Sequence, residues 1–208
     1  MSHSQNRKRN VQHMKSQNQI SDSVSLIKLT VCLLVPVIIT ILGRFLPHTP
    51  NITPILALSL FLGANFPSRI AFITIFIMML FSDIAIGFYT QFPTIGNWSF
   101  FTYSGFIAIA YLGSILLNRV TTLRLVIITP LMSLCFWIWT NLGVWLVGTL
   151  YTKSLSGLLA CYIAAIPFLH NAIFGDVCWI LFLFVCNSKI KAISKKKHVN
   201  SKLFLLNK

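Results

Sequence analysis

Two aspartates stand inside long apolar segments of this chain, and their carboxyl groups are its clearest candidates for chemistry. Asp83 interrupts the run "MMLFSDIAIGFY", Asp176 lies in the last apolar block, and the whole chain holds only three acidic residues. A carboxylate at the centre of a membrane helix costs at least ~2.5 kcal/mol. Ionisable residues in such positions bind substrates, relay protons or pair with groups on neighbouring helices. Each aspartate is therefore a candidate for one of these three roles.

A third polar group, Asn141, lies in another apolar segment between two tryptophans. Trp137, Asn141 and Trp145 occupy positions i, i+4 and i+8, so a helix places all three on one face. Aromatic rings around an amide suit a planar ligand. Packing for Trp137 and an aromatic belt at the membrane surface for Trp145 are the alternatives.

The segments that carry these residues indicate an integral membrane protein. The chain has 208 residues, of which 56% are hydrophobic and 10% charged, too few charges to cover a soluble domain. Six membrane-spanning helices are predicted, at 26–46, 53–66, 70–89, 100–117, 125–148 and 167–187. Pro167 is expected to separate the last of these from a short helix at 158–166.

The second predicted span is unusually short. Residues 53–66 rise only ~21 Å as a helix, whereas the apolar core of a bilayer is ~30 Å thick. A half-span, a helix deep inside the bundle and a span with poorly defined ends all remain open. Small residues four apart, such as Ser59 and Gly63, predict close helix packing in this region.

Basic tails at 1–25 and 188–208 flank the apolar block and predict its orientation. The net charge of +14 is concentrated there, which favours anionic lipid headgroups over nucleic acid as the partner. With both tails cytoplasmic, all but two of the 17 Lys and Arg residues, Arg44 and Lys153, fall on the cytoplasmic side. The sequence thus predicts an all-α, six-helix bundle in a lipid bilayer with both termini in the cytoplasm.

This orientation brings three polar groups to a common depth. Asp83 and Asn141 lie ~10 Å below the outer ends of their spans, and Asp176 lies ~13 Å below. We predict an outward-opening pocket in which these groups hold a small molecule. Hydrogen bonds that merely join neighbouring helices are the alternative, and two adjacent carboxyl groups could also share a proton.

The loop "LPHTPNITP", residues 46–54, adds His48 and Asn51 as candidate binding residues near the pocket mouth. It could form a lid or simply connect two helices. No metal or other cofactor is expected, because His48, His170 and Cys161 show no ligand spacing. The chain has no GxSxG, HExxH or phosphate-binding glycine loop, so we do not expect an enzyme.

Four segments carry a family resemblance: "RFLPHTPNITPILALSLFLGANF", "MMLFSDIAIGF", "TNLGVWLVGTLY" and "GLLACYIAAIPFLHNAIFGD". Together they resemble an uncharacterised family of small bacterial membrane proteins, regarded as related to the substrate-binding (S) components of energy-coupling-factor vitamin transporters. The resemblance covers most of residues 44–184. It implies six helices in the bacterial cytoplasmic membrane, cytoplasmic termini and a substrate pocket on the outer side.

The same resemblance implies a partner, an ATP-driven module that S components contact through an Ala-xxx-Ala face on the first helix. Residues 26–46 contain no alanine, which departs from that pattern. The leading hypothesis is uptake of a vitamin-sized or precursor-sized small molecule. A solitary proton-coupled carrier that uses Asp83 and Asp176, and a membrane scaffold with structural aspartates, remain the alternatives.

Overall fold

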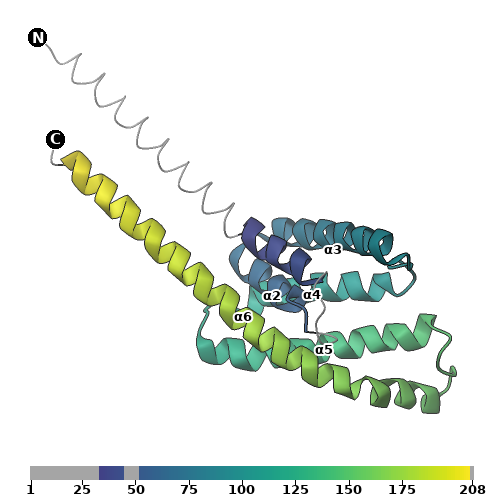
Figure 1. The fold of residues 1–208 in the computed structure, drawn as a ribbon. Helices are drawn as coiled ribbons and strands as arrows, with labels where there is room; N and C mark the ends of the chain where they lie inside the picture. Colours follow the sequence, from purple (N-terminus) through teal and green to yellow (C-terminus); the bar gives the residue numbers. More distant parts are fainter. Residues whose placement is uncertain (1–32, 45–51, 207–208) are drawn as a thin grey trace, which may run out of the picture. The chain divides into compact units, whose positions relative to one another are not determined.

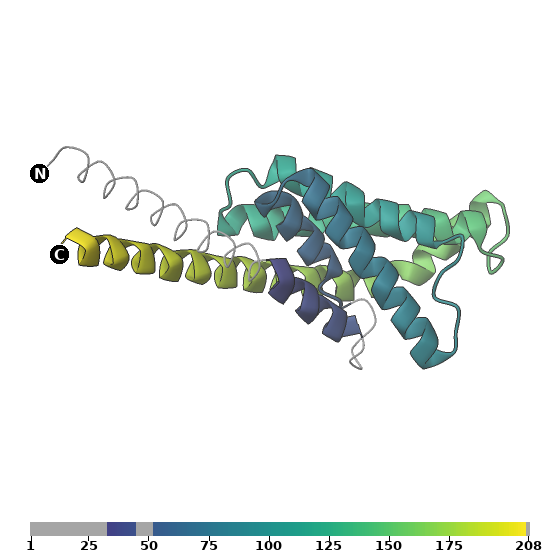
Figure 2. The same ribbon diagram turned by 90° about the horizontal axis from the view of Figure 1, so that it is seen from above.

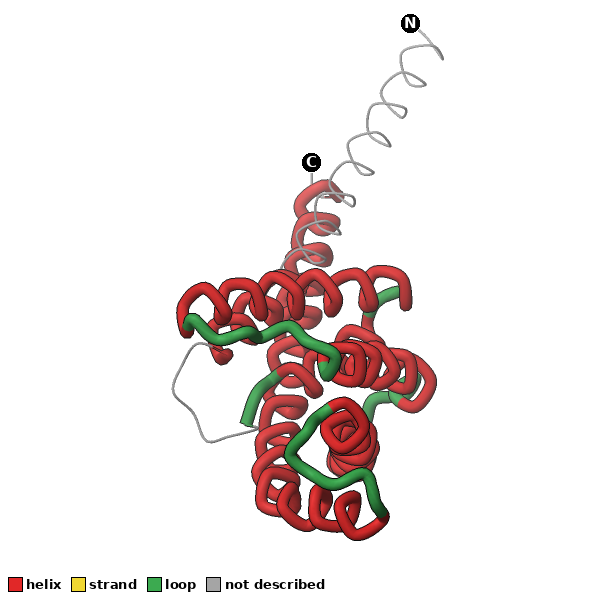
Figure 3. The backbone as a smooth tube through the Cα atoms, turned by 90° about the vertical axis from the view of Figure 1, so that its right-hand side faces the viewer, coloured by secondary structure: helices red, strands yellow, loops and turns green. Residues whose placement is uncertain are grey.

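Helices make up all the regular secondary structure in the described residues (Figure 3). The computed structural model describes residues 33–44 and 52–206. The chain is therefore all-α, as predicted. After a first helix, Leu33–Arg44, the order is α2 Ile55–Asn65, α3 Ser68–Thr90, α4 Ser99–Leu116, α5 Thr122–Val147 and α6 Leu155–Leu206 (Figure 1).

The chain divides into two units. One is Pro36–Val185, and the other consists of the two ends of the chain, Met1–Val35 and Cys186–Lys208. The unit Pro36–Val185 contains the whole lining of the cavity between the helices.

Four of the six helices in the described residues are long and apolar enough to cross a membrane. These are Ser68–Thr90, Ser99–Leu116, Thr122–Val147 and Leu155–Ile190. Large apolar side chains cover their outer faces; Phe88, for example, is 77% exposed. Such surfaces are typical of contact with lipid, because soluble monomers rarely expose large apolar patches.

The two remaining helices, Leu33–Arg44 and α2, are shorter than a bilayer core in the described residues. The 11 residues of α2 rise only about 16 Å. All its residues from Ile55 to Gly63 are buried, and it packs against α3, α4 and α5. A helix that is apolar all round belongs inside a protein. Of the options left open by the sequence, α2 is therefore the helix deep inside the bundle.

Two glycines allow α2 and α4 to approach very closely, and Figure 2 shows the two helices from above. A Cβ atom on Gly63 would lie 1.9 Å from the carbonyl oxygen of Ala110, and one on Gly113 would lie 2.9 Å from the carbonyl oxygen of Leu60. No side chain fits at either place. The prediction of close packing by small residues is thus confirmed at Gly63.

The prediction that Pro167 separates two helices is wrong. Helix α6 runs without interruption from Leu155 to Leu206, with Pro167 inside it, and continues beyond the predicted end of the span at residue 187. A proline has no N–H group for the carbonyl four residues earlier, yet membrane helices tolerate it where neighbouring groups compensate. Helix α5 likewise contains a proline, Pro130, and continues through it.

Thr129 carries a buried hydroxyl group with no hydrogen-bond partner among the described residues. A buried hydroxyl without a partner costs about 1–3 kcal/mol. We therefore expect Thr129→Val to raise the free energy of unfolding by about 1 kcal/mol, since valine fills nearly the same space. Thermal unfolding in detergent measures this change. A loss of 1 kcal/mol or more would show that the hydroxyl has a partner in the folded protein.

Candidate functional site

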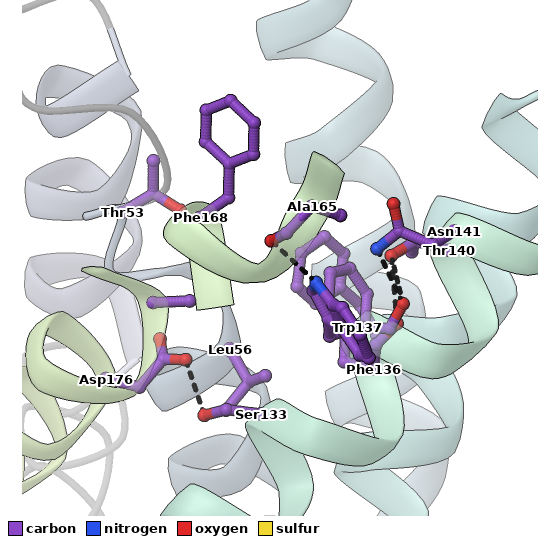
Figure 4. Close-up of a pocket in the computed structure, with 12 residues that line it drawn as sticks. Thr53, Leu56, Ser133, Phe136, Trp137, Thr140, Asn141, Ala165, Phe168 and Asp176 are labelled. Carbon is purple, nitrogen blue, oxygen red and sulfur yellow. Dashed lines mark hydrogen bonds between the residues drawn. The ribbon is translucent and has the colours of Figure 1, made fainter. Parts of the chain in front are cut away.

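A cavity of about 210 Å³ lies between α2, α4, α5 and α6 (Figure 4). Five residues of α5 line it, from Ser133 to Asn141, at positions spaced along one helical face. Four residues of α6, from Ala165 to Asp176, face them at intervals of three and four. Thr53, just ahead of α2, also lines the cavity. One face of α5 and one face of α6 therefore form most of the cavity wall.

Asp176 is the one acidic group among the lining residues, and its side chain points from α6 towards α5 (Figure 4). The residue is only 3% exposed. The hydroxyl group of Ser133 lies 2.7 Å from Asp176 Oδ2. Within the described ranges no basic side chain pairs with this carboxyl group. It is thus a buried acid that faces a cavity without a compensating charge.

Trp137 and Asn141 follow Ser133 on the same face of α5. The indole Nε1–H of Trp137 donates to the carbonyl oxygen of Ala165, 3.0 Å away on α6. The side-chain amide of Asn141 donates to the carbonyl oxygen of Trp137 at 2.8 Å. The first bond fixes the indole ring across the seam between the two helices. The second bond orients the side chain of Asn141 and uses one of the two N–H donors of its amide. The amide oxygen is an acceptor.

Aromatic rings form much of the remaining wall. Phe106 of α4 and Phe136 of α5 both line the cavity and stack, with ring centroids 4.3 Å apart. Trp137 packs against Tyr162, with centroids 5.1 Å apart. Flat apolar walls with a few fixed polar groups are the usual construction of a small-molecule site.

Asp83 is placed elsewhere, in a cluster that joins the first helix, α3 and α4. Its Oδ1 accepts from Arg44 Nη2 at 2.5 Å, and its Oδ2 accepts from the hydroxyl of Tyr103 at 2.6 Å. A second guanidinium nitrogen of Arg44 donates to the hydroxyl of Ser82. None of these four residues lines the cavity. The structure therefore does not bring Asp83 into the pocket of Asp176 and Asn141.

Trp145 also lies outside the cavity lining. Its indole N–H donates to the carbonyl oxygen of Thr152 at 2.9 Å, and Lys153 Nζ sits 5.7 Å from the ring centroid. The lysine also donates to the carbonyl oxygen of Gly148 at 2.6 Å, at the end of α5. Lys153 therefore caps the carboxyl end of α5.

His48 and Asn51 lie outside the described residues. Among the described residues no three His, Cys, Asp or Glu side chains gather as metal ligands would.

Sequence reasoning missed several residues of the site, and the most important is Ser133. It lies four residues before Trp137, on the same helical face, so extending the Trp137–Asn141 stripe by one turn reaches it. The small residues Ala165 and Ala172 gave no chemical signal. Their small side chains leave room for the cavity, and this effect can be recognised only once the packing of α5 against α6 is known.

The fold and the cavity define a class: an all-α protein with four helices that have the length and composition of membrane spans. The chain belongs to a family of unknown function, DUF6580, whose model matches residues 25–198. No curated protein and no solved structure matches the chain. The predicted membership of an uncharacterised family is confirmed, and the relation to S components of vitamin transporters stays a prediction.

Proposed function

We propose that this protein binds a small molecule in the Asp176 cavity and carries it across a membrane. The observation that supports this best is the carboxyl group itself, which is 3% exposed and faces a cavity with no basic partner among the described residues. A buried carboxylate without a counter-charge is costly, and buried charges are normally paired. A bound ligand supplies the missing counter-charge.

The dimensions of the cavity favour a ligand at the small end of the predicted range. Sites for drug-sized ligands enclose about 300–1,000 Å³, and this cavity encloses about 210 Å³. A precursor-sized molecule fits such a space better than a complete vitamin. Uptake in the manner of an S component, with an ATP-driven module as partner, is what the sequence resemblance adds to this proposal.

A thermal-shift screen of small metabolites on the purified full chain tests the proposal. A ligand present at about 100 times its Kd stabilises a protein by about 2.7 kcal/mol, which raises Tm by roughly 5–10 °C for a chain of this size. We expect at least one compound to produce such a shift. Asp176→Asn should abolish most of it, because the amide keeps the shape of the side chain and loses its charge.

A matched pair of variants on α6 controls for general effects on the fold. Ala172→Phe places a ring in the cavity, because Ala172 lines it, and should remove the shift. Ala164→Phe adds the same ring at an exposed position of the same helix and should leave the shift unchanged. A shift that survives Ala172→Phe would place the binding site elsewhere.

The cluster around Asp83 supports a second role, that of a structural aspartate. Its carboxyl group already has Arg44 and Tyr103 as partners, at 2.5 and 2.6 Å. We propose that Asp83 holds the first helix against α3 and α4 and takes no part in ligand binding. Asp83 variants should accordingly have a lower Tm than the wild type. Addition of the ligand should still raise their Tm by as much as it raises that of the wild type.

A further inference from the structure

We propose that the ligand of the Asp176 cavity is a small primary ammonium ion with a single flat ring, and that its binding displaces a proton from Asp176. This inference rests on the proposed function and adds the class of ligand and the event that accompanies binding.

The hydrogen bonds of Ser133 favour a proton on Asp176. The Ser133 oxygen lies 2.7 Å from Asp176 Oδ2 and 3.0 Å from the carbonyl oxygen of Thr129. A serine hydroxyl has one hydrogen to donate, so it makes one well-aligned bond and not two. If the carboxyl group is protonated, it donates to Ser133, and Ser133 donates to Thr129. Both contacts are then hydrogen bonds, and Asp176 is neutral while the cavity is empty.

The surroundings of Asp176 agree with a neutral acid. The element ahead of α2 contributes Thr53, α2 contributes Leu56 and α4 contributes Phe106 to the cavity lining, and none of these side chains titrates. On α5 and α6 the other lining residues are aromatic, small or uncharged polar residues. Isolated ionised carboxylates are very costly to bury, so a carboxyl group in such a place keeps its proton.

Two further titratable groups lie near the cavity without lining it. The thiol of Cys161 is 3.6 Å from the carbonyl oxygen of Asn141, and the hydroxyl of Tyr162 donates to the carbonyl oxygen of Ile138 at 2.9 Å. Both are engaged with the backbone of α5. Asp176 is therefore the one group in the described lining that can exchange a proton with a ligand.

The other polar and aromatic groups of the cavity suit an ammonium ion. Trp137 and Phe136 line the cavity, and the faces of aromatic rings attract cations, those of tryptophan most strongly. The side-chain oxygen of Asn141 is an acceptor, and the bond from its nitrogen to the carbonyl oxygen of Trp137 fixes the orientation of the amide. An ammonium group has three N–H donors, and the Asp176 carboxylate and a ring face can take two of them. Asn141 lies eight residues beyond Ser133 on α5, ~12 Å by helical rise, so its oxygen can accept from another part of the ligand.

Volume limits the rest of the ligand. An engineered apolar cavity of about 150 Å³ binds benzene, and this cavity encloses about 210 Å³. A single ring with a short aminomethyl arm therefore fits. The stacked rings of Phe106 and Phe136, with centroids 4.3 Å apart, provide a flat wall for it.

The exchange balances in charge and atoms. The O–H bond of the Asp176 carboxyl group breaks, and its proton leaves to solvent. The N–H bonds of the ammonium ion remain intact, and the new carboxylate neutralises its charge. One proton leaves for each cation that enters, so the net charge inside the cavity stays zero.

Calorimetric titration of the full chain in detergent tests this exchange, with benzylamine as the probe and benzyl alcohol as its neutral counterpart. Titration at one pH in two buffers with different ionisation enthalpies counts the protons released. We expect benzylamine to bind with release of about one proton. Its affinity should weaken by about tenfold for each unit that the pH is lowered, because a proton and the cation compete for one carboxyl group.

The variants give the control. Asp176→Asn should bind benzylamine at least tenfold more weakly, without proton release or pH dependence. Ala164→Phe should bind as the wild type does. Since the proton count is made on the wild type, it does not depend on any variant folding.

The outcomes separate this inference from the proposed function. Binding of benzylamine without proton release, or equal binding of benzyl alcohol, would overturn the exchange and leave the small-molecule site in place. Absence of binding by benzylamine would overturn the ammonium class. The proposed function would fail only if the metabolite screen also found no compound whose stabilising effect Ala172→Phe removes.

Discussion

Asp83→Asn is expected to lower the free energy of unfolding by about 3–5 kcal/mol, the usual cost of removing one partner from a buried ion pair. Asp83 is 5% exposed and accepts from Arg44 at 2.5 Å and from Tyr103 at 2.6 Å. The amide would leave the guanidinium charge of Arg44 without a counter-charge. Arg44→Met should have a similar effect, because it leaves the carboxylate unpaired. Thermal or denaturant unfolding in detergent measures both.

A double-mutant cycle shows whether the two residues act as a pair. The cycle consists of Arg44→Met, Asp83→Leu and the two combined; the double variant removes both charges and should recover most of the stability lost by either single variant, since apolar replacements of buried ion pairs are often neutral or stabilising. Arg124→Met removes an exposed arginine and should change stability by no more than about 0.5 kcal/mol. Additive losses in the double variant would contradict a direct pairing.

Gly63→Ala is the second change with a large expected effect. The new methyl carbon would lie 1.9 Å from the carbonyl oxygen of Ala110, which is far inside van der Waals contact. A backbone atom cannot turn aside as a side chain can, so α2 and α4 must separate. We expect a loss of about 3 kcal/mol, at the upper end of the range for overpacked cores.

The matched control for that change is Gly43→Ala in the first helix. A methyl carbon there would lie 3.3 Å from the nearest atom, the ring of Pro54. A small movement relieves this contact, and alanine favours a helix by about 1 kcal/mol over glycine. Unfolding measurements should therefore show little loss or a gain. Equal losses from the two variants would contradict the close approach of α2 and α4.

Helical periodicity predicted part of the site, because spacing along one helix suffices to align side chains. Trp137 and Asn141 were placed on one face by their separation of four residues, and both line the cavity. Asp176 was identified by its chemistry, as an acid inside an apolar block, and it lies across from them. Trp145 has the same spacing but does not line the cavity, because it bonds with the segment after α5. Helical spacing alone does not predict such a contact.

The partner of Asp83 was not predicted, although the sequence held a signal. Arg44 was one of only two basic residues assigned to the outer side of the membrane. A basic and an acidic residue, each unusual for its place and both near the outer ends of their spans, are candidates for an ion pair. Depth along separate helices does not reveal which helices are neighbours, and so it could not separate Asp83 from Asp176.

The limits of the helices were harder to predict where proline was involved. Proline in a helix interior often kinks or ends the helix, but α6 continues through Pro167, as membrane helices often do. Trp137 donates to the carbonyl oxygen of Ala165 in the turn before that proline. This bond is not the one that Pro167 removes, which belongs to the carbonyl oxygen of Ile163 four residues earlier, and the sequence pattern alone does not show that the helix continues.

The most direct test of the account is an experimental structure of the protein with a compound that stabilises it. We predict density for the compound between α5 and α6, in contact with Asp176 and within reach of Asn141 and Trp137. Density at the Arg44–Asp83 cluster, or only on the lipid-facing surface, would contradict a small-molecule site at Asp176.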